Sequence, residues 1–546
     1  MKKTLLTLLA FAFLSLLTSC SQKYLMTTFF FKKTKLDIRK TPEFKALNPM
    51  QQDIELLVAL IKDAYPMWEQ KIAPTDLEAE RQRLLQLFAT ETDPNVLEIE
   101  AQRLLARLQD AHTSIMRFNL ESKFYFPFQK LQVRDSFYIG NIGQVAKGDS
   151  AAILGSLIEQ INGFSRSEIN AKIRAFESGE DIYSALFRSS LSNPKYLKAS
   201  GLATQTDSIR LTLKTQNGDL RDVILRPVEF KNFNYFKINR PKSPYKTRQG
   251  NYNYLIDKPN QLAYLNVGTM LDFVCYSDGF KQHVKNPILR PLAKAWMKKQ
   301  AKKSGNLNFK NFVLEAINAA NTEGVKNLVI DLRANGGGDM RVPEQLFYLL
   351  GYDIKKPYHW YSHLSQYYKE NLADDAREDA AKYLKATGKP LVFDGSLVNI
   401  DSLASAKTGY DFYANVKNPK SAFYIAPNTL RFKGNVYFLT ALPTASAAAI
   451  TATLLKDNGL ATIVGTPTGN KSTAQTGASG FKLPHSKVVG GMSYFYVERP
   501  NTAQNDEVAL TPDVEIWQNL SDWYRGVDSQ MAWIIQDIAA KKSTKK

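Results

Sequence analysis

The sequence feature that most constrains the fold is a strand that turns directly into an alanine-rich helix, within residues 435–471. The apolar run Val436–Leu442 is typical of a buried strand, and a Pro-Thr pair ends it. The segment after Ala445 is rich in alanine, the strongest helix former. Ser446 is therefore expected in the first turn of a helix, where backbone amides lack partners within the helix.

The same stretch also contains a candidate base, the side-chain amine of Lys471. A second strand is expected at Ala461–Val464, and the chain then reaches Lys471. A serine hydroxyl becomes a good nucleophile when a base removes its proton, and a lysine can act as that base only when it is uncharged. A hydroxyl, free amides and an amine at one end of a sheet are the parts of an acyl-transfer site.

Length and charge limit the remaining possibilities. A chain of 546 residues is too long for one hydrophobic core, so several units are expected. Its 44% hydrophobic and 23% charged residues are typical of globular proteins. The net charge is +19, but lysines and arginines are scattered and do not alternate with aromatic residues on a recognisable nucleic-acid module. Nucleic acid is not expected as a partner.

The N-terminus has the parts of an export signal: two lysines, the apolar run Leu5–Leu17, and small residues before Cys20. The last four residues of this segment resemble the bacterial lipoprotein box, whose cysteine becomes the lipid-bearing N-terminus. The alternative is a plain secretory signal with an incidental cysteine. We expect residues 1–20 to be the signal and the protein to be attached by lipid to a membrane of the bacterial cell envelope, facing the periplasm or exterior.

Helical sequence follows a polar tether at residues 21–48. From residue 49 to 120, apolar side chains recur every three or four positions, which predicts a helical bundle. The bundle ends in RLQDAHT, which places Asp110 and His112 just past a helix end.

Residues 125–230 change to short strands separated by glycine and asparagine. Gly148–Ile169 resembles the centre of a PDZ domain, in which a strand leads through an Asn-Gly turn to a helix. PDZ domains capture extended peptides by adding a strand to a sheet edge. A small β-rich domain without peptide binding is the alternative.

A second glycine-rich site is expected in the following segment. The apolar strand Asn327–Arg333 leads straight into Asn335 and three glycines, whose backbone can approach a ligand closely. The Lys-Ser/Thr pair of a phosphate-binding loop is missing, so neither a nucleotide nor any other cofactor is expected. Residues 346–429 are irregular and are interpreted as an insertion or lid, and residues 521–546 as a C-terminal helix and basic tail.

Two histidines, His359 and His363, have the spacing of a metal-binding pair on a helix. No glutamate follows His359, and aromatic residues flank both. We expect surface or packing roles and no metal site.

Together, IDLRANGGG, PTASAAAITATLLKDNGLATIVGTPTGNK and TPDVEI resemble the C-terminal processing (tail-specific) serine peptidases. This family also includes the tricorn core protease and retinoid-binding protein modules. RLQDAHT and GSLIEQING occur upstream in the family's usual order, so the resemblance covers about residues 50–520. It implies a multidomain α/β fold: a helical domain at 49–120, a PDZ-like domain at 125–230, and an α/β peptidase core at 245–345 and 430–520.

The resemblance also implies catalytic roles. Ser446 matches the nucleophile, Lys471 the general base of the Ser–Lys branch, and Asp457 an acidic position of that branch. The oxyanion hole is matched by the amide of Ala447 and by one glycine of the pair Gly336-Gly337.

The match has departures that leave the identity of the base open. The family's usual glutamate three places after the nucleophile is Ala449, and the glycine before the lysine is Asn470. The other branch of the family uses a histidine near the position of His112, a residue that can accept a proton near neutral pH without any pKa shift.

Two functional hypotheses follow. The first is an exported, lipid-anchored serine endopeptidase that hydrolyses extended or C-terminal segments of polypeptides. The second is a non-catalytic lipoprotein that binds peptide or lipid on the same scaffold.

Overall fold

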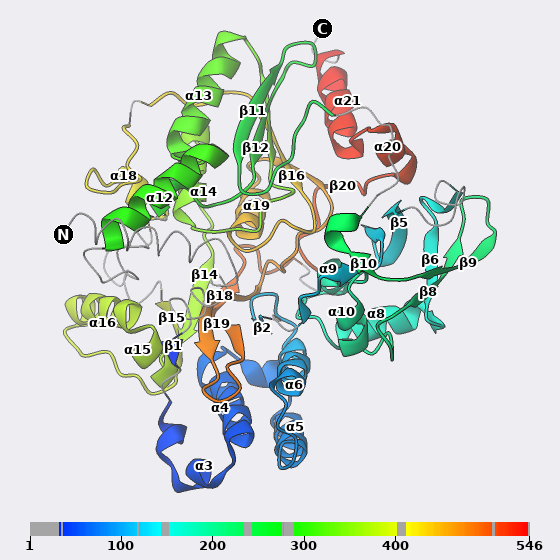
Figure 1. Ribbon diagram of the computed structural model, residues 1–546. Helices are drawn as coiled ribbons and strands as arrows, with labels where there is room; N and C mark the ends of the chain where they lie inside the picture. Colours follow the sequence, from blue (N-terminus) through cyan, green and yellow to red (C-terminus); the bar gives the residue numbers. More distant parts are fainter. Residues whose placement is uncertain are drawn as a thin grey trace, which may run out of the picture.

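The computed structural model describes most of the chain as a mixed helix and sheet protein (Figure 1). The described residues are 32–33, 36–116, 120–143, 152–233, 243–275, 277, 289–400, 411–427, 429–504 and 508–543. The expected lipidation site, Cys20, lies outside them. No helix within these ranges is long and apolar enough to cross a membrane.

The central sheet has six strands. Their order is β11 (Tyr252–Asp257), β12 (Leu262–Val267), β13 (Asn327–Asp331), β16 (Asn435–Thr440), β17 (Thr462–Gly465) and β20 (Val514–Glu515). β11 is antiparallel to β12, and the other pairs are parallel. Parallel strands end at the same edge of the sheet. The glycine loop after β13 and Ser446 after β16 therefore meet at this edge.

Helices cover both faces of this sheet because side chains alternate along its strands. On β12, Ala263 and Leu265 belong to the core formed with α13 (Phe309–Thr322), α14 (Arg341–Leu350) and α19 (Ala447–Asp457). Leu262 and Tyr264 point to the other face and pack with α21 (Ser529–Ser543). The site-bearing edge is thus held between two buried layers.

The N-terminal helices form a separate core. They are α4 (Pro49–Ala64), α5 (Pro74–Leu87) and α6 (Pro94–Ala106), preceded by η1 (Asp37–Lys40) and α3 (Pro42–Ala46). A capping box between Asn48 and Gln51 starts α4. Its apolar face packs against Phe481 and Met492 of a second sheet.

The second sheet joins distant parts of the chain. Its order is β1 (Lys32–Lys33), β18 (Ala474–Lys482), β19 (Val489–Glu498), β14 (His359–His363) and β15 (Leu397–Asn399). The short strand β2 (Ser114–Ile115) also pairs with β19. Because β2 directly follows Asp110 and His112, this pairing fixes the position of both residues.

Residues 124–230 form a third unit, on the right of Figure 1. Its sheet contains β4 (Phe128–Val133), β5 (Ser136–Ile142), β6 (Leu157–Ile161), β8 (Ile209–Lys214) and β9 (Leu220–Leu225), with β7 (Phe164–Ser165) pairing with β6. The helices are α8 (Arg166–Arg174), α9 (Ile182–Arg188) and α10 (Pro194–Ala199). Two further strands, β3 (Phe124–Tyr125) and β10 (Val228–Glu229), pair at its boundary. Asn162 and Gly163 both have positive φ in the turn before α8.

The segment expected to be an irregular insertion contains regular structure. α15 (Gln366–Asn371), α16 (Ala373–Thr387) and α18 (Ala414–Lys417) lie within residues 346–429, and β14 and β15 extend the second sheet. His359 and His363 lie on a strand, so the helical spacing of a metal pair does not apply to them.

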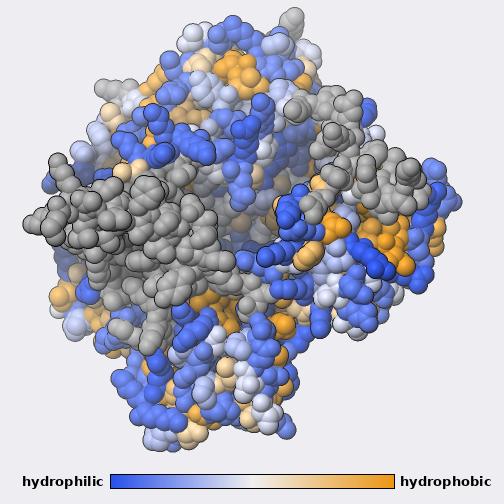
Figure 2. Space-filling view, in the orientation of Figure 1, coloured by the Kyte–Doolittle hydropathy of each residue, from blue (hydrophilic) through white to orange (hydrophobic). Residues whose placement is uncertain are grey.

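The remaining helices lie around these units. They are η2 (Trp68–Gln70), η4 (Phe230–Asn232), the lysine-rich α12 (Leu289–Ser304) and α20 (Leu520–Arg525). Among the residues coloured in Figure 2, hydrophilic ones cover most of the visible face and hydrophobic ones form separate patches, as expected when apolar residues fill several separate cores.

Candidate active site

Ser446 occupies a strained turn between β16 and α19. Its backbone has φ 52° and ψ −129°, a conformation that residues other than glycine rarely adopt. Its N–H donates to Asn470 Oδ1 at 2.7 Å. The preceding turn is held by Thr444, whose hydroxyl accepts from Ala441 N at 2.9 Å and donates to Leu332 O at 2.8 Å. Such a sharp strand-to-helix turn is the arrangement that presents a nucleophilic serine in other hydrolase folds.

The glycine loop after β13 lies directly against Ser446. A Cβ atom placed on Gly337 would lie 2.6 Å from Ser446 Cβ and 2.7 Å from Ala445 O. Gly337 also has φ +100°, so both space and backbone conformation require glycine here. A Cβ on Gly336 would meet no atom within 4 Å, so the loop has open space beside it.

The Ala447 amide and one of the two candidate glycines for the oxyanion hole, Gly337, lie beside Ser446. Ala447 is the first residue of α19, and its N–H has no hydrogen-bond partner within the described residues. Gly337 N–H instead donates to Asn335 Oδ1 at 2.8 Å. Asn335 is anchored in turn, because its Nδ2 donates to Val267 O at 2.8 Å. The Ala447 amide is therefore the donor that is ready to receive a ligand.

Asn470 connects Ser446 to a buried acid. The Asn470 Oδ1 atom holds Ser446 N–H, and its Nδ2 donates to Glu180 Oε1 at 2.7 Å. Glu180 Oε2 accepts from the backbone N–H of Lys471. Burial, together with the nearby charge of Asp110, raises the pKa of Glu180 to about 8. This acid comes from the loop between α8 and α9 of the third unit.

His112 lies next to this acid. Its side chain is 17% exposed, and its Nδ1 atom is buried, has no hydrogen-bond partner in the described part of the chain, and lies 3.9 Å from Asp110 Oδ1. Burial lowers the pKa of His112, while the charge of Asp110 opposes this shift. The imidazole is therefore uncharged at neutral pH, as a general base must be.

Polar atoms of Asp110, His112 and Glu180 all lie within 4.8 Å of one another. These residue types could ligate a cation. However, Lys71 interacts electrostatically with both acids and Arg188 with the imidazole, so positive charge already faces the cluster. The arrangement suits proton transfer better than metal binding.

Lys471 follows Asn470 directly and is partly buried. Its backbone is fixed by Glu180. Within the described residues, Lys471 Nζ makes no hydrogen bond, and Ser446 Oγ bonds to neither of the two expected bases. Hydrogen bonds between nucleophile and base often tighten only when substrate is bound.

Asp457 lies away from this group, at the opposite end of α19. Eleven helical residues at about 1.5 Å each separate it from Ser446 by about 16 Å. Its carboxylate makes a bidentate pair with Arg499 at 2.6 and 3.0 Å and accepts from Asn501 N at 3.0 Å. Both charged side chains are at most 3% exposed. Asp457 thus ties α19 to the chain after β19.

Sequence reasoning missed Glu180 and treated Asn470 only as a departure from a family pattern. Glu180 lies in a polar loop 290 residues before its partner Asn470, and no local spacing marks it. The unusual asparagine beside a candidate lysine was the one available signal, because a buried carboxamide needs hydrogen-bond partners.

Comparison with known proteins places these residues in a known fold. Residues 299–516 match the sequence model of peptidase family S41. The structure of mature CPAF complexed with lactacystin covers 90% of this chain and 98% of its own, with 14% identity and a TM-score of 0.53. The crystal structure of mature CPAF covers 89% of this chain and 95% of its own, with the same identity and TM-score.

A further solved structure and the search of curated proteins support no additional conclusion. The photosystem II D1 C-terminal processing protease covers 89% of this chain and 99% of its own at 12% identity, but its TM-score of 0.36 is too low to support an argument. No curated protein matches the sequence. The two CPAF structures therefore establish the fold, and the S41 match covers Ser446, Lys471 and the glycine loop.

Proposed function

The chain is a serine-type peptidase of family S41, as its resemblance to the tail-specific peptidases predicted, and from this premise we propose that Ser446 is its nucleophile. The observation that supports this most is the strained turn at Ser446, with the glycine loop against its Cβ atom and the Ala447 amide beside it. The hydroxyl and an oxyanion donor thus lie on adjacent residues.

We propose His112 as the general base, with Lys471 as the alternative. His112 is uncharged at neutral pH, and its buried Nδ1 lies 3.9 Å from Asp110 Oδ1, so the charge of Asp110 can stabilise the imidazolium that forms. Lys471 would have to lose its proton before it could act. Its partly buried position and its place next to Asn470 support the alternative.

The reaction then proceeds in two halves. The base takes the Ser446 proton while Oγ attacks the peptide carbonyl, and the Ala447 amide donates to the oxyanion. Gly337 contributes a second donor if its N–H turns away from Asn335. The protonated base gives its proton to the leaving amine, which departs and leaves an acyl-serine. Water, deprotonated by the same base, attacks the ester and restores the hydroxyl.

Polypeptides are the substrates of a peptidase, and we propose that extended or C-terminal segments are preferred. The support is the turn at Asn162-Gly163 between β6 and α8 of the third unit, residues 124–230, because the resemblance to a PDZ domain rests on this turn. The same unit supplies Glu180, so a segment held there would lie near the catalytic residues.

The nucleophile is tested by hydrolysis of an unfolded protein. Protein lacking residues 1–20 should cleave it, and Ser446→Ala should lose about 10³-fold or more of kcat. Equal turnover by both proteins would contradict the proposal and favour the non-catalytic binder on the same scaffold.

The base is tested by comparing His112→Ala with Lys471→Ala. We expect His112→Ala to lose about 10²- to 10⁴-fold in kcat/KM, the usual contribution of general-base catalysis. Lys471→Ala should retain most of the activity. The reverse order would assign the base to Lys471.

We further propose that Cys20 carries lipid and anchors the enzyme to a membrane of the cell envelope. The support is the signal-like sequence that ends in LTSC. In bacteria fed a labelled fatty acid, the wild-type protein should become labelled and sediment with membranes. Cys20→Ser should do neither, and a labelled Cys20→Ser protein would disprove this site.

A further inference from the structure

The loop between α8 and α9, residues 175–181, is the point at which the third unit enters the catalytic core. Gln102 of α6 donates to Phe176 O at 2.8 Å and to Ser178 Oγ at 3.1 Å. On the other side, Asp181 Oδ2 accepts from Ala509 N at 2.9 Å. The loop therefore contacts both the N-terminal helices and the peptidase core.

This loop has little freedom to move. A Cβ atom on Gly179 would lie 2.4 Å from Ala185 N, so the loop packs directly on α9. Arg174 donates to Asp181 O at 2.8 Å. Asp181 caps α9 through a hydrogen bond from Ser184 N at 2.7 Å. Glu180 is consequently held in one position, 5% exposed, with its carboxyl group directed at the core.

Glu180 fixes the orientation of a neighbouring carboxamide. Asn470 could present either its oxygen or its nitrogen to Ser446 N–H, and only the oxygen can accept. Because Asn470 Nδ2 donates to Glu180 Oε1, the oxygen is left facing the serine. The second Glu180 oxygen accepts a hydrogen bond from the Lys471 N–H, so the carboxyl group orients both Asn470 and Lys471.

We propose that Glu180 is a positioning residue that acts through Asn470 to hold the Ser446 backbone in its strained conformation. This inference rests on the proposed function, in which Ser446 is the nucleophile. Since positive φ at a non-glycine residue is a strained conformation, the turn persists only while its surroundings hold it. The third unit is then a structural part of the active site, in addition to its proposed role in binding substrate.

Glu180→Ala tests this proposal. Asn470 loses the acceptor that orients it, and the Ser446 hydroxyl is displaced from the oxyanion donor. We expect kcat to fall about 10- to 100-fold, the effect of a small misplacement of a reacting group. KM should stay within about twofold. The rate at which a fluorophosphonate labels Ser446 should fall in parallel with kcat. Glu180→Gln retains one acceptor and should lie between Glu180→Ala and the wild type.

Asp181→Asn is the matched control. Asparagine keeps one oxygen, which can still accept from Ser184 N and cap α9, and it loses the second acceptor, which holds Ala509 N. The contact between Glu180 and Asn470 is left in place. Its kcat should stay within about twofold of the wild-type value. Equal losses from Asp181→Asn and Glu180→Ala would show that the loop matters only for packing, and would overturn the proposal.

A double-mutant cycle separates positioning from misfolding. If Glu180 acts through Asn470, the variant Glu180→Ala/Asn470→Ala should be no slower than Asn470→Ala alone. Multiplicative losses would overturn the proposal, and so would wild-type kcat and labelling in a folded Glu180→Ala protein. If Glu180→Ala fails to fold, the same comparison is made with Glu180→Gln. Full activity of Ser446→Ala would instead overturn the proposed nucleophile.

Discussion

At the scale of single residues, the site depends on two backbone conformations that most side chains disfavour. Ser446 has positive φ at the start of α19, and Gly337 has positive φ in the loop pressed against it. Each holds the other in place, because Ala445 N donates to Asn335 O at 3.0 Å across the same contact. Strain at the proposed nucleophile is thus maintained by close packing of backbone against backbone.

Gly337→Ala is expected to inactivate the enzyme. The new Cβ would lie 2.6 Å from Ser446 Cβ and 2.7 Å from Ala445 O, so the loop or the serine must shift. We expect kcat/KM for a peptide to fall about 100-fold or more. Gly336→Ala is the control, because its Cβ meets no atom within 4 Å. Because a bound substrate could touch a side chain at Gly336, the activity of Gly336→Ala alone is not a sufficient control. Thermal melting therefore compares the folding of the two variants, and Gly336→Ala should melt like the wild type. Full activity of Gly337→Ala would contradict the described contact.

The pH dependence distinguishes the two candidate bases. Burial lowers the pKa of His112 below its usual value of about 6.5. The charge of Asp110 raises this pKa and the charge of Arg188 lowers it further, and the net shift is downward. Burial and the charge of Asp110 raise the pKa of Glu180 to about 8, above the range in which the acid decline is expected. A base acts when it is unprotonated, so activity should be lost as the pH falls through the His112 pKa. We expect kcat/KM to be level at neutral pH and to decline below about pH 6.5.

The same profile is measured on Lys471→Ala. The acid decline should persist in this variant and disappear in the residual activity of His112→Ala. A rate that rises steadily into the alkaline range and becomes independent of pH in Lys471→Ala would assign the role to the lysine.

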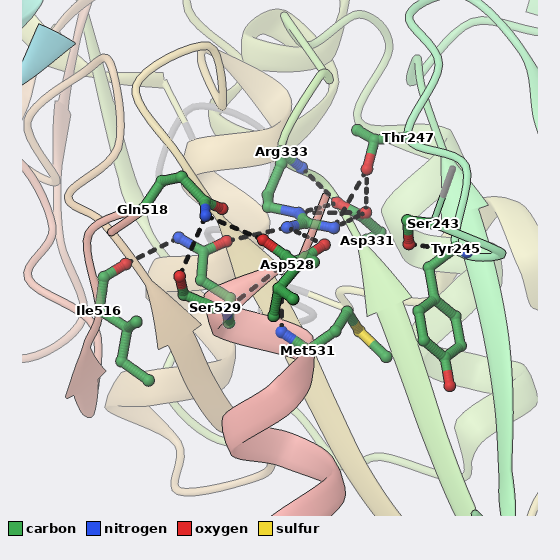
Figure 3. Close-up of polar contacts among 12 residues, drawn as sticks. Ser243, Tyr245, Thr247, Asp331, Arg333, Ile516, Gln518, Asp528, Ser529 and Met531 are labelled. Carbon is green, nitrogen blue, oxygen red and sulfur yellow. Dashed lines mark hydrogen bonds and ion pairs between the residues drawn. The ribbon is translucent and has the colours of Figure 1, made fainter. Parts of the chain in front are cut away.

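At the scale of elements, α21 is tied to the strand that carries the glycine loop. Arg333, two residues after β13, pairs with Asp331 at 2.7 Å and with Asp528 at 2.7 Å, just before α21 (Figure 3). It also donates to Gln530 Oε1 at 3.1 Å. Although burial opposes it, the charge of Arg333 holds the pKa of Asp331 below its usual value. The C-terminal helix therefore braces the loop that contacts Ser446.

Arg333→Met should strongly destabilise the protein. It leaves Asp331, which is fully buried, without its cation, and breaking a buried pair in this way costs about 3–5 kcal/mol. Arg525→Met is the matched control, because its pair with Asp522 lies within α20 and Arg525 is 67% exposed. That pair should contribute about 1 kcal/mol or less. Denaturant titration measures both free energies of unfolding, and similar losses would contradict the role of Arg333.

Individual elements were predictable to different extents. The segment that contains β16, Ser446 and α19 was predicted because its signals are local: an apolar run, a Pro-Thr break and repeated alanines. β14 was missed because four of its five residues are aromatic or histidine, and because it is stabilised by pairing with residues of β19 that lie more than 130 positions later. Sheet pairing over such separations leaves little trace in a single sequence.

At the scale of the whole molecule, the proposed active site is assembled from three separately packed units. The peptidase core supplies Ser446 and the glycine loop, the end of the N-terminal helices supplies His112, and the third unit supplies Glu180. The resemblance of several motifs in order predicted the peptidase family, whereas the contacts between units could not be predicted. Their hydrogen bonds join residues about 290 positions apart.

The most direct test of this account is to map the residue that reacts with a fluorophosphonate probe, by mass spectrometry of the protein lacking residues 1–20. We predict a single modified peptide that carries the probe on Ser446, loss of peptide hydrolysis in proportion to its labelling, and no labelling of Ser446→Ala. A fully active protein with unmodified Ser446, or a probe attached to another serine whose replacement abolishes hydrolysis, would contradict the account.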